Sequence, residues 1–243
     1  MYSKVSDIVR NKVDRLLSGF VFTYEDILPE VKKKEAVIKA LNRLVASGRI
    51  SKLSRGRYYK PEKTPFGELM PPQEQVVKDL LVEDGKIVGY LTGLSIYNRL
   101  GLTTQVGNTI EVGRNDVRPS FKRERYRIKI IRQKNIITKE NFPLLQLLDV
   151  LRYIKKIPDT TAKQSISRMV KVISEHTVDE LNKMTKLVIK YPPSTRALYG
   201  AILDELNQGK LVQPLFDSLN PITKYEIKGA ADILAHASKW SLV

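Results

Sequence analysis

The order of structural signals in the first sixty-odd residues constrains this chain more than any other feature. Apolar residues recur at helical spacing from Ser3 to Leu17, which predicts a first helix. A brief second helix is predicted to begin at Tyr24, because the Thr23 hydroxyl can cap it and Pro29 then limits it. A third helix is predicted from about Lys33 to Ala46. Three helices therefore stand at the start of the chain.

A basic hairpin follows the third helix. Arg49–Leu53 is predicted to be a strand, Ser54-Arg55-Gly56 a tight turn and Arg57–Lys60 the returning strand. Three helices followed by a basic hairpin are the parts of a winged helix-turn-helix, in which the third helix enters the major groove and the hairpin touches the adjacent backbone. We therefore expect residues 1–65 to form a winged helix DNA-binding domain.

The third helix presents a polar outer face opposite an apolar one. Asn and Arg side chains on that face suit the edges of adenine and guanine, and the lysines suit phosphates. Tyr58 and Tyr59 point to opposite faces of their strand, so one is expected to pack inward while the other is left for a phosphate. The candidate DNA-binding residues are Thr23, Lys32, Lys33, Lys34, Lys39, Asn42, Arg43, Lys52, Arg55, Arg57, Tyr58 and Tyr59.

Charge is concentrated in the same segment. The whole chain of 243 residues has a net charge of +16, and a field of that sign attracts polyanions such as nucleic acid. Residues 1–65 contain fifteen basic and seven acidic residues, so half of the net charge lies in about a quarter of the chain. This concentration is typical of a phosphate-binding surface, although a solvated basic face would have the same composition.

The remaining residues, 66–243, are predicted to form a second, larger domain. Residues 61–72 are rich in Pro and Gly and are expected to be an extended connector. Residues 66–140 have mixed helix and strand signals, with a helix around Gln73 to Leu81, a helix capped by Thr92, and a strand from Asn108 to Val112. The predicted fold class is α+β, mainly α.

Residues 141–243 are predicted to be helical. Helical periodicity indicates five helices, one of them capped by Ser194, at 144–156, 160–175, 178–189, 194–207 and 222–235.

A second basic stretch lies between Arg114 and Lys134. In it Tyr126, Ile128 and Ile130 alternate with charged residues, which predicts a strand with one wet face. A second nucleic-acid surface and a solvated, charge-protected edge strand explain this stretch equally well. Its role stays open at this point.

No pattern indicates catalysis or a cofactor. The chain has no cysteine, and His176 and His236 stand apart from any metal-ligand spacing, so neither a thiolate nor a metal site is expected. Walker loops, dinucleotide-binding glycine motifs and nucleophile elbows do not occur. With no signal peptide and no long apolar segment, we expect a cytoplasmic, non-membrane protein that is not an enzyme and takes no small-molecule substrate.

Two stretches of the sequence resemble a known family. The segments "ALNRLVASGRISKLSRGRYYKP" and "GYLTGLSIYNRLGLTTQ" are similar to the AbiEi-like antitoxins of type IV (AbiE) toxin–antitoxin systems, over roughly residues 5–150. This resemblance implies an N-terminal winged helix that binds operator repeats in double-stranded DNA and represses its own operon. It also implies a C-terminal domain that counteracts a nucleotidyltransferase-like toxin. Lys33, Lys34, Lys39, Arg43, Arg55 and Arg57 would carry the DNA contact.

Two other hypotheses remain open. The chain could be a protein-interaction adaptor, in which the winged helix is structural and residues 141–243 bind a toxin or another subunit. It could also bind RNA through residues 114–134, with a preference for single strands. The operator sequence, the oligomeric state and the identity of any toxin are beyond the sequence.

Overall fold

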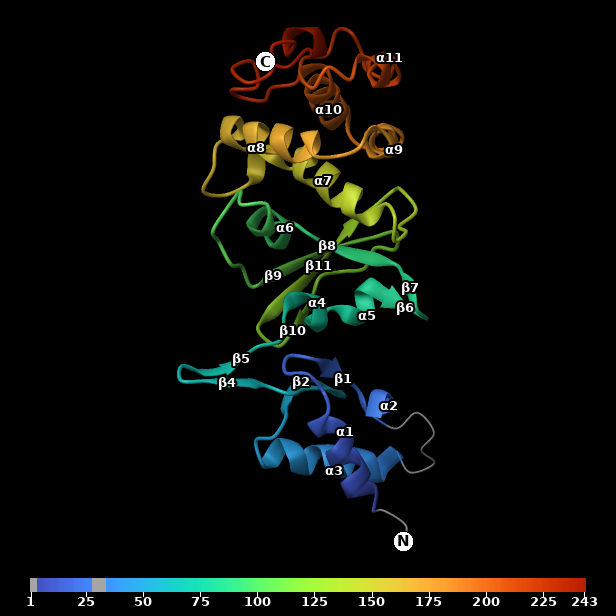
Figure 1. Cartoon of the computed structure of the whole chain (residues 1–243), viewed down its shortest axis with the longest axis vertical. Coiled ribbons are helices and arrows are strands. Elements are labelled where there is room, and N and C mark those ends of the chain that lie inside the picture. Colours follow the sequence, from blue (N-terminus) through green and yellow to red (C-terminus); the bar gives the residue numbers. More distant parts are fainter. Residues whose placement is uncertain (1–3, 28–33) are drawn as a thin grey trace. The chain divides into compact units, whose positions relative to one another are not determined.

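The computed structural model describes residues 4–27 and 34–243, which form two compact units (Figure 1). Unit 1 contains the chain up to Asp79 together with Phe121–Arg127. Unit 2 contains Leu80–Ser120 and Ile128–Val243. The first unit therefore extends past the boundary at residue 65 that the sequence predicts, and it includes a segment from the middle of the chain.

Unit 1 begins with three helices and a small sheet. Its first elements are α1 (Val5–Asp14), β1 (Val21–Phe22), α2 (Tyr24–Ile27), α3 (Lys34–Ala46), β2 (Ser51–Ser54) and β3 (Arg57–Tyr59). The strands form an antiparallel sheet in the order β1-β3-β2, with Val21 and Ser51 both paired to Tyr59. The predicted helices and hairpin are thus confirmed, and Gly56 makes the hairpin turn at a φ of 76°, where a side chain would be strained.

The core of unit 1 lies between the helices and the sheet. Val9, Val13, Val37 and Leu41 pack there with other buried apolar side chains, including those of the strands. The rings of Phe22 and Tyr58 stack with their centroids 6.1 Å apart. The apolar residues that recur at helical spacing in α1 and α3 therefore form the buried faces of these helices, as the sequence predicts.

The segment after β3 differs from the expected extended connector. Glu62–Thr64 (β4) and Gly67–Leu69 (β5) pair as an antiparallel hairpin, with Gly67 at a φ of 116° after the turn. The prediction was wrong because Pro and Gly mark tight turns as readily as extended linkers.

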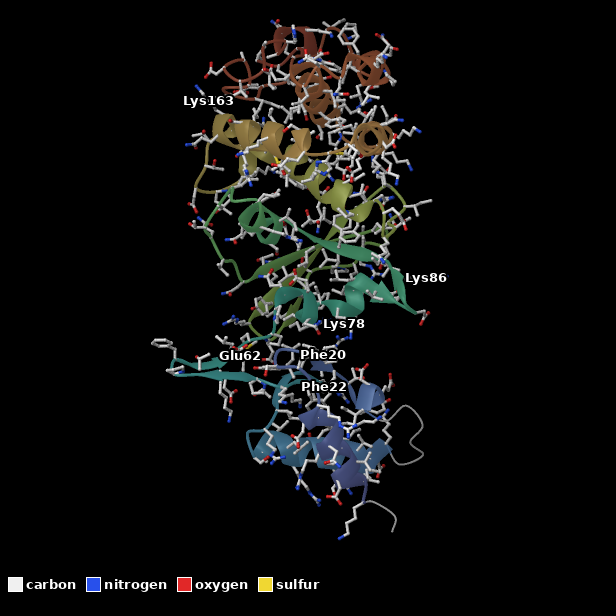
Figure 2. The ribbon with its side chains drawn as sticks, viewed as in Figure 1. Phe20, Phe22, Glu62, Lys78, Lys86 and Lys163 are labelled. Atoms are coloured by element: carbon white, nitrogen blue, oxygen red, sulfur yellow. The ribbon has the colours of Figure 1, made fainter. Side chains whose placement is uncertain are left out.

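A cation–π contact links two other parts of unit 1. The Lys78 ammonium lies 4.4 Å from the centroid of the Phe20 ring (Figure 2).

The single helix expected at 73–81 is broken in two. Its parts are α4 (Gln73–Val76) and α5 (Lys78–Leu81). The break falls at Val77, which has a φ of −114° and a ψ of 16°. Both Val76 and Val77 are buried, so tertiary packing of this pair takes precedence over helix continuity.

Unit 2 begins with a small hairpin and most of a sheet. The hairpin pairs β6 (Val82–Glu83) with β7 (Lys86–Ile87). The sheet has the order β10-β11-β9-β8, and its strands are β8 (Gly89–Thr92), β9 (Thr109–Arg114), β10 (Phe121–Arg123) and β11 (Tyr126–Arg132). Buried and exposed residues alternate along β11, as predicted, but β11 lies between β10 and β9. The interpretation of this basic stretch as a charge-protected edge strand is therefore wrong for β11.

The predicted cap by Thr92 is wrong. Thr92 ends β8, and α6 (Leu94–Arg99) begins after Gly93, whose φ is 68°. The Thr92 hydroxyl instead donates a hydrogen bond of 3.1 Å to a carboxylate oxygen of Asp149. The Thr92 hydroxyl is thus hydrogen-bonded to the buried Asp149 carboxylate instead of to the start of α6.

The rest of unit 2 is mostly helical, which confirms the predicted character of residues 141–243. Its elements are α7 (Phe142–Arg152), η1 (Ile154–Lys156), α8 (Ala162–Ser174), α9 (Val178–Val188), α10 (Pro193–Glu205), η2 (Gly209–Leu211), α11 (Gln213–Asp217) and η3 (Ser238–Trp240). Thr161 and Thr177 close capping boxes with Gln164 and Glu180 at the starts of α8 and α9. Within the described part of the chain no helix is long and apolar enough to cross a membrane.

Two expectations for this region are wrong. The residue before α10 is Pro192, with no side-chain cap, so Ser194 lies inside the helix. Residues 222–235 form turns rather than a helix, because Tyr225 pairs with the end of the chain through its N–H to Ser241 O at 2.8 Å. Its carbonyl accepts from the N–H of Val243 at 3.0 Å. These long-range bonds take the backbone groups that a helix would use.

A buried carboxylate links the strands and helices of unit 2. Asp149, in the middle of α7, is 1 % exposed and accepts hydrogen bonds from the hydroxyls of Tyr90 (2.9 Å), Tyr191 (3.0 Å) and Thr92 (3.1 Å). Burial raises the pKa of Asp149 to about 6, although the hydrogen bonds from Tyr90, Tyr191 and Thr92 oppose that rise. The Gln133 side-chain amide completes the cluster by donating to the hydroxyls of Tyr90 and Tyr191.

The raised pKa of Asp149 predicts an acid-side stabilisation. The folded chain holds this proton up to about pH 6, whereas the unfolded chain holds it only up to its ordinary pKa of 3.8. The stabilisation is therefore full below about pH 4 and is lost as the pH rises to about 6, to a total on the order of 3 kcal/mol. Urea unfolding of the wild type and of Asp149→Asn at pH 4–7 measures it. The free energy of unfolding of the wild type should fall relative to the variant over this range, and a constant difference would contradict the prediction.

Candidate nucleic-acid interface

The outer face of α3 is exposed along its length. Val37, Leu41 and Leu44 are buried against the core, while Lys39, Asn42 and Arg43 are exposed on the opposite side. Asn42 and Arg43 follow Lys39 by three and four positions, so the three side chains lie on one side of the helix. The sequence predicts this arrangement, and the structure brings the three side chains together.

The start of α3 is only partly described. Lys34 is exposed, and its ammonium lies 4.6 Å from the centroid of the Tyr24 ring. Lys32 and Lys33 lie outside the described residues. The Thr23 hydroxyl accepts the N–H of Glu25 at 3.2 Å and donates to Asp26 at 3.0 Å, so Thr23 caps α2 as predicted. Its hydroxyl is thus committed within its own helix start.

The hairpin divides its cations into two kinds. Lys52 and Arg55 are exposed on β2 and at the turn. Lys60, in contrast, donates to the carbonyls of Asp14 (2.9 Å) and Leu16 (3.1 Å) and so satisfies acceptors at the end of α1. Arg57 is also turned toward the protein. Lys52 and Arg55 therefore face solvent, while Arg57 and Lys60 are engaged by the protein.

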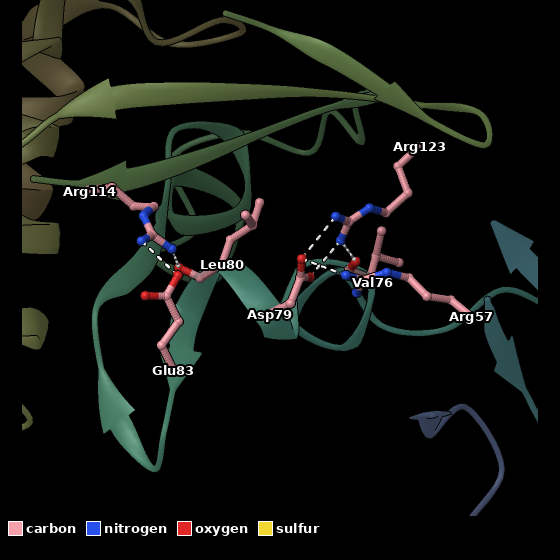
Figure 3. Close-up of polar contacts among 7 residues, drawn as sticks. All are labelled: Arg57, Val76, Asp79, Leu80, Glu83, Arg114 and Arg123. Carbon is pink, nitrogen blue, oxygen red and sulfur yellow. Dashed lines mark hydrogen bonds and ion pairs between the residues drawn. The ribbon is translucent and has the colours of Figure 1, made fainter. Parts of the chain in front are cut away.

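Arg57 takes part in a three-residue ion network. Its guanidinium lies 2.7 Å from Asp79 Oδ2, and Arg123 contacts both Asp79 oxygens at 2.7 and 3.1 Å (Figure 3). Burial would raise the pKa of Asp79, but the hydrogen bonds and charges of Arg123 and Arg57 outweigh it and hold that pKa below its ordinary value. The network ties the hairpin and residues 121–127 to the end of unit 1.

Both tyrosines of β3 are buried, where the sequence expects only one to be. Tyr58 is 4 % exposed, and its hydroxyl donates to Asn42 Oδ1 at 3.4 Å. Tyr59 is 5 % exposed, and its hydroxyl donates to the Met70 sulfur at 3.5 Å. Desolvation by burial raises the pKa of both phenols. The alternation of a strand fails here because both faces of β3 are covered, by the core of unit 1 at Tyr58 and by Met70 at Tyr59.

The second basic stretch is also divided between internal and exposed cations. Arg123 belongs to the network with Asp79, and Arg114 is buried in unit 2, where it contacts Glu83 (2.9 Å) and the Leu80 carbonyl (2.9 Å) (Figure 3). Arg114 also contacts Asp116 at 2.6 Å. The exposed cations of the stretch are Arg118, Lys122, Arg125, Arg127, Lys129, Arg132 and Lys134. Two of the arginines that suggest a binding surface in the sequence thus have structural roles.

No metal centre is present among the described residues. No group of three His, Asp or Glu side chains there is placed to hold an ion. His176 lies next to the carbonyl of Val172, with its Nδ1 at 3.0 Å. The candidate site of unit 1 is the set of exposed cations on α3 and the hairpin, which are Lys34, Lys39, Arg43, Lys52 and Arg55.

Comparisons with known proteins give a family and a fold relative. The model of the Family of unknown function (DUF6088) matches residues 8–181. The crystal structure of the Rv2827c protein from Mycobacterium tuberculosis is similar over 93 % of this chain and 84 % of that one, with a TM-score of 0.51 and 14 % sequence identity. At that identity the likeness concerns the fold alone. A search of the curated proteins found no match.

The ion network predicts a large difference between two Asp→Asn substitutions. Asp79→Asn leaves Arg123, whose side chain is 8 % exposed, without a charged partner, and should lower the free energy of unfolding by roughly 2–3 kcal/mol. Asp14→Asn is the matched control, because its pair with Arg49 is about half exposed on both sides and is worth at most about 0.5 kcal/mol. Urea unfolding of both variants measures the difference. Equal losses would show that the network does not hold unit 1 together.

Proposed function

The chain belongs to the Family of unknown function (DUF6088), and we propose that it is a DNA-binding transcriptional regulator whose N-terminal unit is a winged helix-turn-helix. One observation carries the proposal: Lys39, Asn42 and Arg43 form an exposed polar face on α3, the helix that precedes the β2–β3 hairpin. In a winged helix this is the helix that enters the major groove. The proposed DNA target would place the protein in the cytoplasm.

The contacts of the face assign different roles to its residues. Among the described residues the Arg43 side chain has no ion-pair or hydrogen-bond partner, so its guanidinium is available for the O6 and N7 atoms of a guanine. The Asn42 side-chain oxygen already accepts from Tyr58, which competes with the paired hydrogen bonds that Asn makes to adenine. We therefore assign base recognition to Arg43 first and a supporting role to Asn42.

The exposed lysines and the hairpin supply affinity in this proposal. Lys34, Lys39, Lys52 and Arg55 are exposed and can neutralise phosphates, which positions the protein without reading sequence. Arg57, Tyr58 and Tyr59 are engaged inside the unit and act indirectly, by holding the hairpin against α3 and the rest of unit 1. The contact surface is thus smaller than the charge of residues 1–65 suggests.

The resemblance to AbiEi-like antitoxins supports a narrower form of the proposal. In this form the chain represses its own operon and counteracts a nucleotidyltransferase-like toxin. A test is whether a neighbouring reading frame encodes such an enzyme and whether co-expression of this chain restores growth of cells that produce it. Growth that stays arrested with the full chain present would remove the antitoxin role and leave the regulator.

The DNA-binding proposal makes distinct predictions for single variants. Fluorescence anisotropy with duplexes selected from a random pool measures affinity as a function of salt. Arg55→Ala and Lys39→Ala should weaken binding to all duplexes alike and reduce the slope of log affinity against log salt by about 1 each. Arg43→Ala should cost about 1–3 kcal/mol on the preferred duplex and little on others.

A matched control uses the same kind of cation outside unit 1. Lys171 is exposed on α8, so Lys171→Ala changes the net charge equally but should leave affinity and salt slope unchanged. Absence of duplex binding at low salt would overturn the proposal. The proposal would also be overturned if Arg43→Ala, Lys39→Ala and Arg55→Ala had the same affinity for duplex DNA and the same salt slope as Lys171→Ala.

A further inference from the structure

Unit 2 contains a cavity of about 560 Å³ with a strongly basic lining. Four segments meet around it: the end of β11 with the two residues that follow, the last residue of α7, the connection from α9 to α10, and the first turn of α10. No acidic residue lines it. Its five cations are Arg132, Lys134, Arg152, Lys190 and Arg196. A cavity of this size accommodates a small organic ligand.

The cations of this pocket have no direct carboxylate partner among the described residues, although the charge of Arg152 acts on the buried Asp149. Within the described part of the chain none of the five forms an ion pair, whereas the buried arginines 114 and 123 both do. Arg196 donates from one terminal nitrogen to the Ser218 carbonyl at 2.9 Å, but its Nε is buried without a hydrogen-bond partner. A donor left without a partner is costly, and it belongs to a residue that lines the pocket.

The helix α10 adds to the positive potential. Its thirteen residues begin at Pro193, with no side-chain cap at Pro192, and both prolines line the pocket. The amino end of a helix carries a partial positive charge that favours anions. Pro192 and Pro193 have no N–H, and the N–H groups of Thr195 and Arg196 donate to the Pro192 carbonyl, so this helix end contributes the field of its dipole rather than free donors.

The floor of the pocket is held rigid by the Asp149 cluster. Tyr191 and Gln133 both line the pocket, and both are engaged behind it. The Tyr191 hydroxyl donates to Asp149 and accepts from Gln133 Nε2 at 2.9 Å, while Gln133 Oε1 accepts the N–H of Asn135 at 2.8 Å. These bonds position the floor before any ligand arrives, which lowers the entropic cost of binding.

The remaining lining is apolar. Ile189 is 41 % exposed and stands beside Pro192 and Pro193 along the rim of the pocket. A free phosphate ion would leave these side chains unused, while a phosphate ester with a flat organic group would contact them. The lining thus combines several cations with a few apolar side chains, which suits an anionic ligand that also has an organic group.

We propose that this pocket binds a phosphorylated small molecule of nucleotide size, with its phosphates against the cations and its organic group against Ile189 and the prolines. The proposal replaces the expectation that the chain takes no small molecule. It does not depend on DNA binding by unit 1, because all of its residues lie in unit 2.

The test is calorimetric titration of the full chain with ATP, and with adenosine as the uncharged comparison. ATP should bind and adenosine should not. Arg132→Glu and Lys134→Glu, both on exposed residues, should each weaken ATP binding about tenfold or more, as expected for the loss of a charge-assisted contact. Lys171→Glu, an equal charge reversal on the exposed side of α8, should change it less than about twofold.

Three results would overturn the proposal. ATP could fail to bind at millimolar concentration, adenosine could bind as tightly as ATP, or Lys171→Glu could weaken ATP binding as much as the pocket variants do. Binding of a short oligonucleotide through Arg132 and Lys134, with no ATP binding, would overturn it in favour of a nucleic-acid surface. Lys39→Ala and Arg55→Ala should leave ATP binding unchanged, so DNA binding by unit 1 and ATP binding by unit 2 can be tested separately.

Discussion

The buried carboxylate of Asp149 is the constraint on which the structure of unit 2 depends. It stands within α7 and accepts hydrogen bonds from Tyr90 and Thr92 of β8. It also accepts one from Tyr191, which lies in the connection between α9 and α10. A carboxylate in such surroundings is stable only when its oxygens are satisfied, so the three hydroxyls must approach together. This requirement places a strand, a helix and a helix connection in one arrangement, and the basic pocket is built on it.

Local patterns predicted the elements whose own residue spacing decides which side is buried. The alternation of Tyr126, Ile128 and Ile130 indicated a strand, and the spacing of Val37, Leu41 and Leu44 indicated the buried face of α3. Both patterns follow directly from which side of an element faces the core. The exposed face of α3 could be predicted for the same reason, which is why that part of the candidate interface emerged from the sequence alone.

Features set by distant residues could not be predicted. Arg57 lies in a hairpin that looks entirely solvent-facing, yet its partner Asp79 is twenty-two positions away and Arg123 comes from another part of the chain. Residues 222–235 have helical spacing, but their backbone bonds go to the chain end. One signal was available for the Asp149 cluster: a single acid within the apolar run "LLQLLDVL" has no solvated face on which to lie.

The position of residues 121–127 has a consequence for how such a protein can change over generations. The chain passes between the two units three times, after Asp79, after Ser120 and after Arg127. A recombination event that exchanged only the N-terminal stretch would leave behind Arg123, the partner that Asp79 requires. The N-terminal unit is therefore not a transferable cassette, and any new target specificity has to arise by substitution within it, most readily on the outer face of α3.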